Sequence, residues 1–173
     1  MPGFTESSIT LNFPDDNWFR FNPGCAGYAK LSGNGFKEMD ACWYDNNANI
    51  FWIFELKDFT VADITLAKDI EGRSWNLIKK AVDTLCMFVS SKHAYPFANE
   101  FLNPFFSYKP DDGTQFKFVS IIHCSASQKT NVQLINNFFR NKFIPYAKLF
   151  NIQHYTVVEH SKAISNIPYN IVQ

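Results

Sequence analysis

Two neighbouring segments in the first third of the chain have the residue pattern of β-strands. In residues 50–57, "IFWIFELK", β-branched and aromatic residues form a run that is too short for a typical amphipathic helix. Residues 36–44 alternate in character and end in aromatic residues, and the polar turn "DNNAN", residues 45–49, separates them from the apolar run. We therefore expect the two segments to pair as an antiparallel hairpin, whose second strand is covered on both faces.

Two later segments carry apolar residues at helical spacing. Residues 74–93 predict an amphipathic helix with Ser74 as its N-cap, and its apolar stripe comprises Ile78, Ala81, Val82, Leu85 and Val89. Residues 131–150 predict a second helix, with Asn131 as its cap and Pro145 as a kink or a break. The stripe of this second helix comprises Val132, Ile135, Phe139 and Phe143.

Shorter patterns complete the expected fold. Residues 9–13, 116–124 and 152–160 have the composition of strands, whereas the rest of residues 1–35 mixes short apolar stretches with Pro and Gly and indicates loops. From residue 36 on, the order is β-β-α-β-α-β, which indicates an α/β fold with a mixed central β-sheet flanked by helices. The 173 residues are most simply one domain, with an irregular segment at 1–35 and a core at 36–160.

Composition limits the class of protein. No apolar run approaches the roughly 20 residues that cross a bilayer, so we expect no membrane partner. The four cysteines lie far apart and form no C-x-x-C pair, which argues against a zinc or redox motif and favours reduced thiols in a cytoplasmic protein. A disulfide between Cys42 and Cys124 is the alternative.

The charges are unevenly distributed along the chain. The formal net charge is zero, which argues against a strong non-specific binder of polyanions. Residues 1–112 nevertheless hold 15 acidic and 10 basic residues, whereas residues 113–173 hold 6 basic residues and a single acid, Glu159. Such an asymmetry can place acids in one site and bases along its rim, although the charges can also mingle once the chain has folded.

The end of the expected hairpin carries the charges most suggestive of chemistry. Because successive side chains of a strand alternate between faces, Glu55 and Lys57 point the same way and Leu56 points away. The hairpin register can bring Asp40 beside Glu55. Two adjacent carboxylates repel each other, so their pairing is most readily explained by a divalent cation between them.

In these residues the sequence resembles the PD-(D/E)XK nuclease superfamily, the restriction-endonuclease-like proteins. The core of that superfamily is a hairpin with an acid on one strand and (D/E)-x-K on the next, followed by a helix and a further strand. The resemblance covers residues 36–124 and rests on Asp40, on the triplet Glu55-Leu56-Lys57 and on the β-β-α-β order. Met39-Asp40 stands in place of the Pro-Asp of the family, a departure that many members share.

The resemblance implies a metal-dependent endonuclease. Asp40 and Glu55 would bind Mg²⁺ or Mn²⁺, with the backbone carbonyl of Leu56 as a further ligand, and Lys57 would orient the attacking water and offset phosphate charge. Some members add a glutamate from an N-terminal helix, for which Glu6 and Glu38 are the alternatives here. The implied substrate is nucleic acid, with DNA favoured over RNA.

Four basic residues outside the triplet are candidates for contacts with the nucleic-acid backbone: Lys79, Lys80, Lys129 and Arg140. Because the net charge gives no long-range attraction to DNA, a homodimer or a partner subunit is also expected. Two alternatives compete with catalysis. The acids and Lys57 can be ordinary exposed charges at a strand end, or the chain can be a catalytically inactive nuclease-fold module that binds nucleic acid or a protein.

Overall fold

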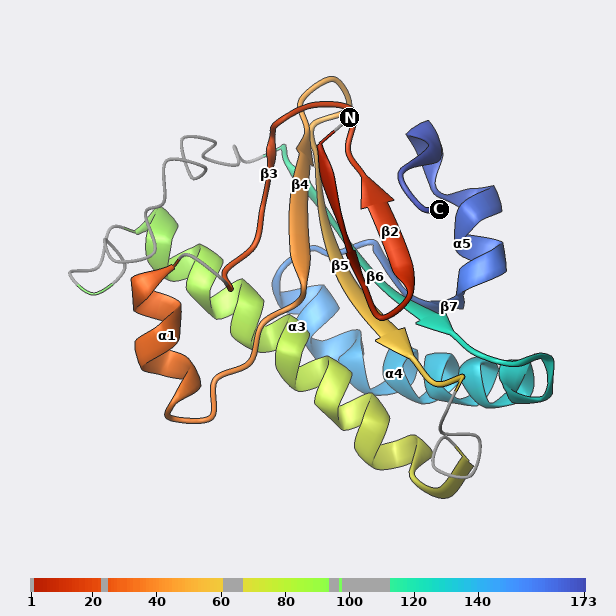
Figure 1. The fold of residues 1–173 in the computed structure, drawn as a ribbon. Coiled ribbons are helices and arrows are strands. Elements are labelled where there is room, and N and C mark those ends of the chain that lie inside the picture. Colours follow the sequence, from red (N-terminus) through yellow and green to blue (C-terminus); the bar gives the residue numbers. More distant parts are fainter. Residues whose placement is uncertain (1, 23–24, 61–66, 94–96, 98–112) are drawn as a thin grey trace.

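The computed structural model describes residues 2–22, 25–60, 67–93, 97 and 113–173. Its centre is a five-stranded mixed sheet with the strand order β3-β4-β5-β6-β7 (Figure 1). β4 pairs antiparallel with β3 and β5, whereas β5, β6 and β7 run parallel to one another. The strands are β3 (Trp18–Phe19), β4 (Ala41–Asp45), β5 (Ile50–Asp58), β6 (Gln115–His123) and β7 (His154–Glu159).

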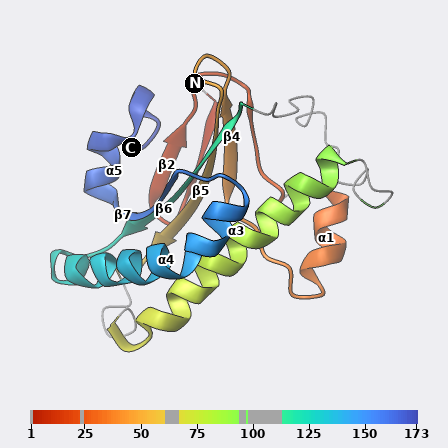
Figure 2. The same cartoon turned by 180° about the vertical axis from the view of Figure 1, so that it is seen from behind.

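Two long helices cover one face of this sheet. α3 (Ile70–Lys92) lies between β5 and β6 in the chain, and α4 (Lys129–Leu149) lies between β6 and β7; the two helices lie across the sheet in Figure 2. The expected α/β fold with a mixed sheet flanked by helices is therefore confirmed. Shorter helices are α1 (Ala26–Ser32), α5 (His160–Asn166) and the 3₁₀ turns η3 (Ala126–Gln128) and η4 (Pro168–Asn170).

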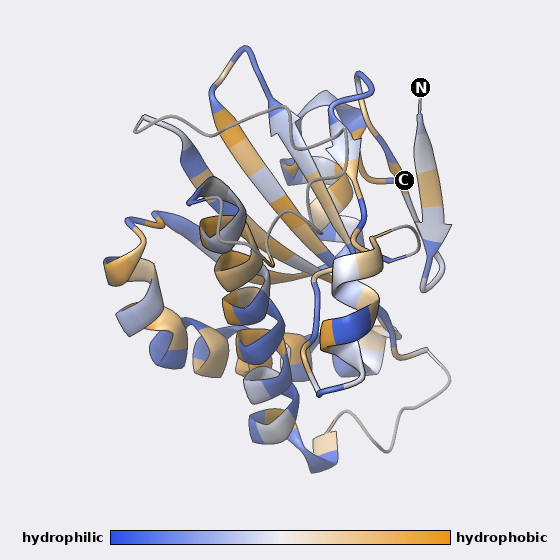
Figure 3. Cartoon of the chain, turned by 90° about the vertical axis from the view of Figure 1, so that its left-hand side faces the viewer, coloured by the Kyte–Doolittle hydropathy of each residue, from blue (hydrophilic) through white to orange (hydrophobic). Residues whose placement is uncertain are grey.

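The alternation of side chains along β5 builds a hydrophobic core on each face of the sheet. Phe51 and Ile53 pack into the core beneath α3 and α4. Trp52, Phe54 and Leu56 pack into a second core, with α5 and the hairpin of β1 (Gly3–Glu6) and β2 (Ile9–Asn12). Figure 3 shows the hydrophobic stretches along the central strands. The expectation that this strand is covered on both sides is confirmed.

The N-terminal segment is more regular than the sequence predicted. The strand expected at residues 9–13 is present as β2, but residues 1–35 also contain β1, β3 and α1, so the expectation of an irregular segment was wrong. The side chains of Ile9, Leu11 and Phe13 are fully buried because this hairpin covers the second face of the sheet.

The first strand of the central hairpin begins later than predicted. β4 starts at Ala41, so the expected strand over residues 36–44 was wrong at its beginning. The reason lies on α3, where the Asp83 carboxylate accepts the backbone N–H of Lys37 at 2.9 Å and the Thr84 hydroxyl accepts that of Met39 at 3.0 Å. The backbone donors that would have extended the strand are bonded to a helix instead.

The expected helix caps were also wrong. The N-cap of α3 is Asp69, whose side chain accepts the N–H of Gly72 at 2.9 Å, whereas the Ser74 hydroxyl donates to the Ile70 carbonyl inside the helix. Val89, placed in the apolar stripe, is exposed.

α4 begins at Lys129, two residues before the expected cap Asn131, and continues through Pro145 without a break. Residue 141 is exposed, so water can satisfy the carbonyl that loses its helical partner to this proline. All four cysteines are free thiols, and none of the helices in the described ranges combines the length and apolar character needed to cross a membrane.

Candidate active site

Asp40 lies where the central hairpin opens. The last residue pair of the β4–β5 ladder joins Ala41 to Phe54. Beyond this pair, the Asp40 carboxylate takes the role of a backbone acceptor of β4. Its Oδ2 accepts the backbone N–H of Leu56 at 2.7 Å. The side chain is buried, and this bond fixes the carboxylate beside the end of β5.

Glu55 and Lys57 project from β5 toward α3. Both continue the face of Phe51 and Ile53, which packs beneath the helices, and Figure 1 shows the end of β5 passing beside α3. Glu55 is fully buried, and Lys57 Nζ lies 2.7 Å from Glu55 Oε1. Lys57 itself is 32% exposed, so the triplet joins a buried acid to an ammonium that solvent can reach.

One ammonium group joins the two acids. Lys80 Nζ, from α3, lies 2.6 Å from Glu55 Oε1 and 3.4 Å from Asp40 Oδ1. Since both distances share the same nitrogen, Asp40 Oδ1 and Glu55 Oε1 lie at most about 6 Å apart, and one ammonium bridges the two carboxylates. The structure thus brings Asp40, Glu55 and Lys57 together, and adds Lys80 between the two acids.

The environment favours the protonated form of Glu55 and of Glu38. Burial raises the pKa of Glu55 to about 7, and Asp40 adds to this effect while Lys80 and Lys57 oppose it. Burial and the neighbouring Asp40 raise the pKa of Glu38 to about 8, against the influence of Lys80 and Arg20. Burial alone would lower the pKa of Lys80, but Glu55 and Asp40 reverse the direction and raise it.

Glu55 has unused coordinating capacity. Its Oε2 is buried and has no hydrogen-bond partner in the part of the chain that the structure describes, and the same is true of Glu38 Oε2. In those ranges, no group of three or more His, Cys, Asp or Glu side chains is placed to hold a metal ion. Two carboxylates suffice for Mg²⁺ when waters and substrate phosphates complete its coordination.

The tip of the N-terminal hairpin closes over the end of β5. The Ser7 hydroxyl donates to the Leu56 carbonyl at 3.2 Å, so the expected backbone ligand lies beside the acids but already accepts a hydrogen bond. Glu6 forms an ion pair with Arg20, whose Nε donates to the Asp40 carbonyl at 3.0 Å. Glu6 is thus held on a strand by an arginine, and Glu38 is the additional acid whose own pKa is shifted by Asp40, Lys80 and Glu55.

The four basic residues expected to contact nucleic acid lie in different places. Lys80 is part of the acid cluster and only 14% exposed. Lys79, the next residue on α3, pairs with Asp83 at 2.6 Å. Lys129 pairs with Glu159 at 3.1 Å. The Arg140 guanidinium donates to the Tyr155 carbonyl at 3.1 Å on the edge strand β7.

A small pocket of about 160 Å³ opens beside Lys57. Arg73 and Asn76 of α3 line it with Phe59, and the Arg73 guanidinium lies 4.6 Å from the centre of the Phe59 ring. Leu77, Ile122 and Ile135 supply apolar walls. The pocket therefore holds two cationic side chains next to the acid cluster.

Sequence reasoning missed Ser7, Arg20 and Arg73 as neighbours of this site. Ser7 lies in the turn between β1 and β2, and Arg20 directly follows β3. The turn chemistry around Ser7 gave no indication of a contact 49 residues away. For Arg73 a signal existed, because it lies four residues before Leu77 on the same side of α3.

No protein-family model matches this chain, and neither a curated protein nor a solved structure matches it.

Proposed function

We propose that this protein is a metal-dependent nuclease that hydrolyses phosphodiester bonds, preferentially in DNA, through Asp40, Glu55 and Lys57. The observation that carries the proposal is the pair of buried carboxylates, Asp40 and Glu55, that share one ammonium at the end of a hairpin. Charged groups are rarely buried without a role or a compensating partner. The succession of the β4–β5 hairpin, α3 and β6 also agrees with the core order of the PD-(D/E)XK superfamily.

The residues of the site fit a bound Mg²⁺ or Mn²⁺. Oxygen ligands are what these hard cations prefer, and Glu55 Oε2 is a buried carboxylate oxygen without a hydrogen-bond partner among the described residues. Asp40 and Glu55 would hold the ion, with the Leu56 carbonyl beside them. When bound, such an ion lowers the pKa of a coordinated water and stabilises charge that develops on phosphorus.

Lys80 balances the carboxylates when no divalent cation is bound. Its ammonium contacts both acids, and two cations in so small a space repel each other. Divalent-cation binding therefore competes with the Lys80 ion pairs.

Lys57 and Arg73 provide a place for the substrate phosphate. Both line the 160 Å³ pocket beside Glu55, and guanidinium and ammonium groups are the usual protein partners of phosphate. Lys57 holds the phosphate next to the acids and offsets the negative charge of the transition state. Because the net charge is zero, approach to DNA relies on this local site and on a second subunit or partner rather than on long-range attraction.

Cleavage of plasmid and oligonucleotide substrates tests the proposal. With Mg²⁺ we expect cleavage that a chelator abolishes and that Lys57→Ala and Glu55→Gln remove. The matched control is Lys162→Ala, because Lys162 is an exposed lysine on α5, outside the site, and this variant should cut like the wild type. Absence of cleavage on both DNA and RNA, or full activity in Lys57→Ala, refutes the proposal.

A second candidate function is a catalytically inactive module that keeps this site as a structural ion network. The observation in its favour is that Lys80 already compensates both acids. Such a module would bind nucleic acid or a protein without turnover and would gain no stability from Mg²⁺, whereas the nuclease would gain it.

A further inference from the structure

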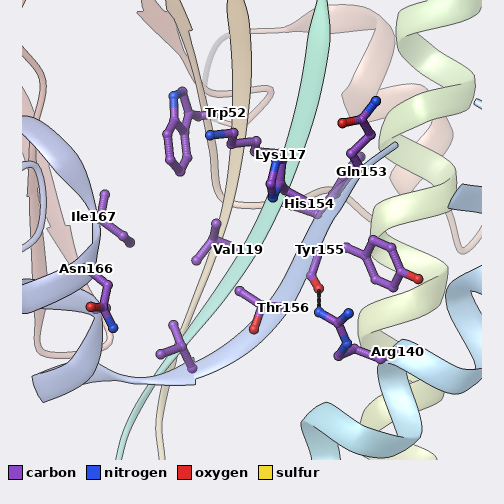
Figure 4. A pocket seen from close by; sticks show the side chains of 13 residues that line it. Trp52, Lys117, Val119, Arg140, Gln153, His154, Tyr155, Thr156, Asn166 and Ile167 are labelled. Carbon is purple, nitrogen blue, oxygen red and sulfur yellow. Dashed lines mark hydrogen bonds between the residues drawn. The ribbon is translucent and has the colours of Figure 1, made fainter. Parts of the chain in front are cut away.

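A larger pocket, of about 390 Å³, lies on the opposite face of the sheet from the acid cluster. Three side chains cross it side by side, because Trp52 of β5 pairs in register with Lys117 of β6, and Lys117 pairs with His154 of β7. They share a face with the core beneath α5, whereas Glu55 and Lys57 point toward α3. We call this cavity the Trp52–Lys117 pocket (Figure 4).

One end of the Trp52–Lys117 pocket is basic. Lys117 and His154 line this end, Arg140 reaches the pocket from α4 beside Tyr155 (Figure 4), and no aspartate or glutamate lines the pocket among the residues described. The Lys117 ammonium lies 4.6 Å from the centre of the Trp52 ring, an arrangement that holds the charge in place without neutralising it. This end is therefore suited to an anion.

The Trp52 ring adds an aromatic wall to this end of the pocket. The indole is 6% exposed, and its Nε1 is buried with no hydrogen-bond partner within the described ranges. Because Nε1 is buried, a ligand in the pocket meets the ring of Trp52 rather than this N–H.

The rest of the pocket has apolar walls, and Gln153, Thr156 and Asn166 are its uncharged polar residues. Val119, Val158, Ala163 and Ile167 form its walls, and Asn166 stands beside Ile167 at the end of α5. Figure 4 shows Asn166 and Ile167 across the pocket from His154 and Lys117. The pocket thus combines a cationic end, apolar walls and a carboxamide that can both donate and accept hydrogen bonds.

We propose that the Trp52–Lys117 pocket binds a nucleoside monophosphate with an adenine base. The phosphate lies at Lys117 and His154, and the base lies between the apolar walls. The Asn166 amide pairs with the edge of the base, and adenine is the base with which such a side-chain amide pairs best. The volume of about 390 Å³ falls in the range of small-molecule sites. The inference does not depend on the proposed nuclease activity.

Isothermal titration calorimetry of the full chain with adenosine monophosphate tests this inference, in EDTA so that no divalent cation contributes. We expect saturable binding, with adenosine and inorganic phosphate each at least tenfold weaker. A charge-assisted hydrogen bond contributes about 1.5–3 kcal/mol, so Lys117→Gln should weaken binding by about tenfold or more. Asn166→Ala should remove the preference for adenosine monophosphate over cytidine monophosphate.

Two further variants serve as controls. Lys117→Arg keeps the charge and should retain binding, which separates loss of the site from loss of the fold. Lys142→Gln changes an exposed lysine of α4 that does not line the pocket and should bind like the wild type. No binding at millimolar nucleotide, equal binding of phosphate and nucleotide, equal binding of adenosine and nucleotide, or an unchanged affinity in Lys117→Gln would each overturn the inference.

Discussion

Replacing Lys80 with alanine should destabilise the protein strongly and in a pH-dependent way. The ammonium contacts Glu55, which is fully buried, and Asp40, which is nearly so. Removal of one partner from a buried ion pair costs about 3–5 kcal/mol because the remaining charge is uncompensated. We expect this cost at pH 8, where Glu55, with a pKa of about 7, is mostly ionised in the wild type.

The same substitution should cost much less at pH 5. Below a pKa of about 7 Glu55 binds a proton, and a neutral carboxyl group needs no counter-ion, so the loss of Lys80 then leaves no uncompensated charge on Glu55. Urea denaturation in EDTA at pH 5, 6.5 and 8 measures the free energy of unfolding of each protein. The double variant Lys80→Ala/Glu55→Gln should recover much of the stability lost at pH 8.

Lys79→Ala is the matched control. Lys79 is the adjacent residue on α3, is 46% exposed and pairs with Asp83 one turn away, and such exposed pairs contribute about 0.3–0.5 kcal/mol. If Lys80→Ala costs no more than Lys79→Ala at pH 8, or if its cost does not change with pH, the ammonium does not compensate the buried acids. The reasoning about the site would then fail.

Mg²⁺ extends this experiment to the proposed metal site. Since Lys80 competes with a divalent cation, Mg²⁺ should stabilise Lys80→Ala more than the wild type, and a hundredfold excess over the dissociation constant corresponds to about 2.7 kcal/mol. Equal or absent stabilisation of the two proteins would argue against cation binding between Asp40 and Glu55.

Three further predictions concern the same region. The pKa values of Glu55 and Glu38 are raised to about 7 and about 8, so their contribution to stability is complete below the unfolded-state pKa of about 4.5 and is lost as the pH rises through the folded-state values. Solvent screening reduces the share of the partly exposed Glu38, and the buried Glu55 alone corresponds to a loss on the order of 3 kcal/mol between pH 5 and 8, which urea denaturation should show as smaller in Glu55→Gln. Thr84→Val leaves the buried Met39 N–H without its acceptor and should lower the free energy of unfolding by about 1–3 kcal/mol, whereas an unchanged value would mean that this bond does not hold the segment before β4. Arg73→Gln should reduce the rate of Mg²⁺-dependent cleavage on the order of a hundredfold with little change in melting temperature, and wild-type cleavage would exclude Arg73 from the phosphate pocket.

The parts of the fold that follow from local patterns were predictable. β5 was expected at residues 50–57 and spans Ile50–Asp58, because its apolar run and its turn lie within the same stretch of chain. The beginning of β4 was not predictable, since the groups that bind the Lys37 and Met39 backbone come from α3, 46 and 45 residues away. The alternation of residue character along the chain cannot predict a strand boundary that such distant side chains determine.

The same distinction holds for the candidate site. The common face of Glu55 and Lys57 follows from the period of a strand, and Asp40 follows from extending the hairpin register by one pair. The position of Lys80 depends on the rotation of α3 about its axis. Lys80 lies three residues after Leu77 and four before Thr84, which are both buried. This spacing indicates the side of the helix that faces the sheet, whereas Lys79 is turned by about 100° toward solvent.

The alternation of β5 also explains how one strand can serve two chemically different sites. Glu55 and Lys57 point toward α3, where Asp40 and Glu38 add acids, and Trp52 points the other way, beside Lys117. Glu38, Asp40 and Glu55 of the N-terminal part of the chain therefore lie on one face, and Lys117 and His154 of the C-terminal part line a pocket on the other. Because the sheet separates the two sites, a substitution at Lys117 should leave Mg²⁺ binding unchanged, and a substitution at Glu55 should leave nucleotide binding in EDTA unchanged. Calorimetry on the two variants distinguishes this independence from a single extended site, in which each substitution would weaken both ligands.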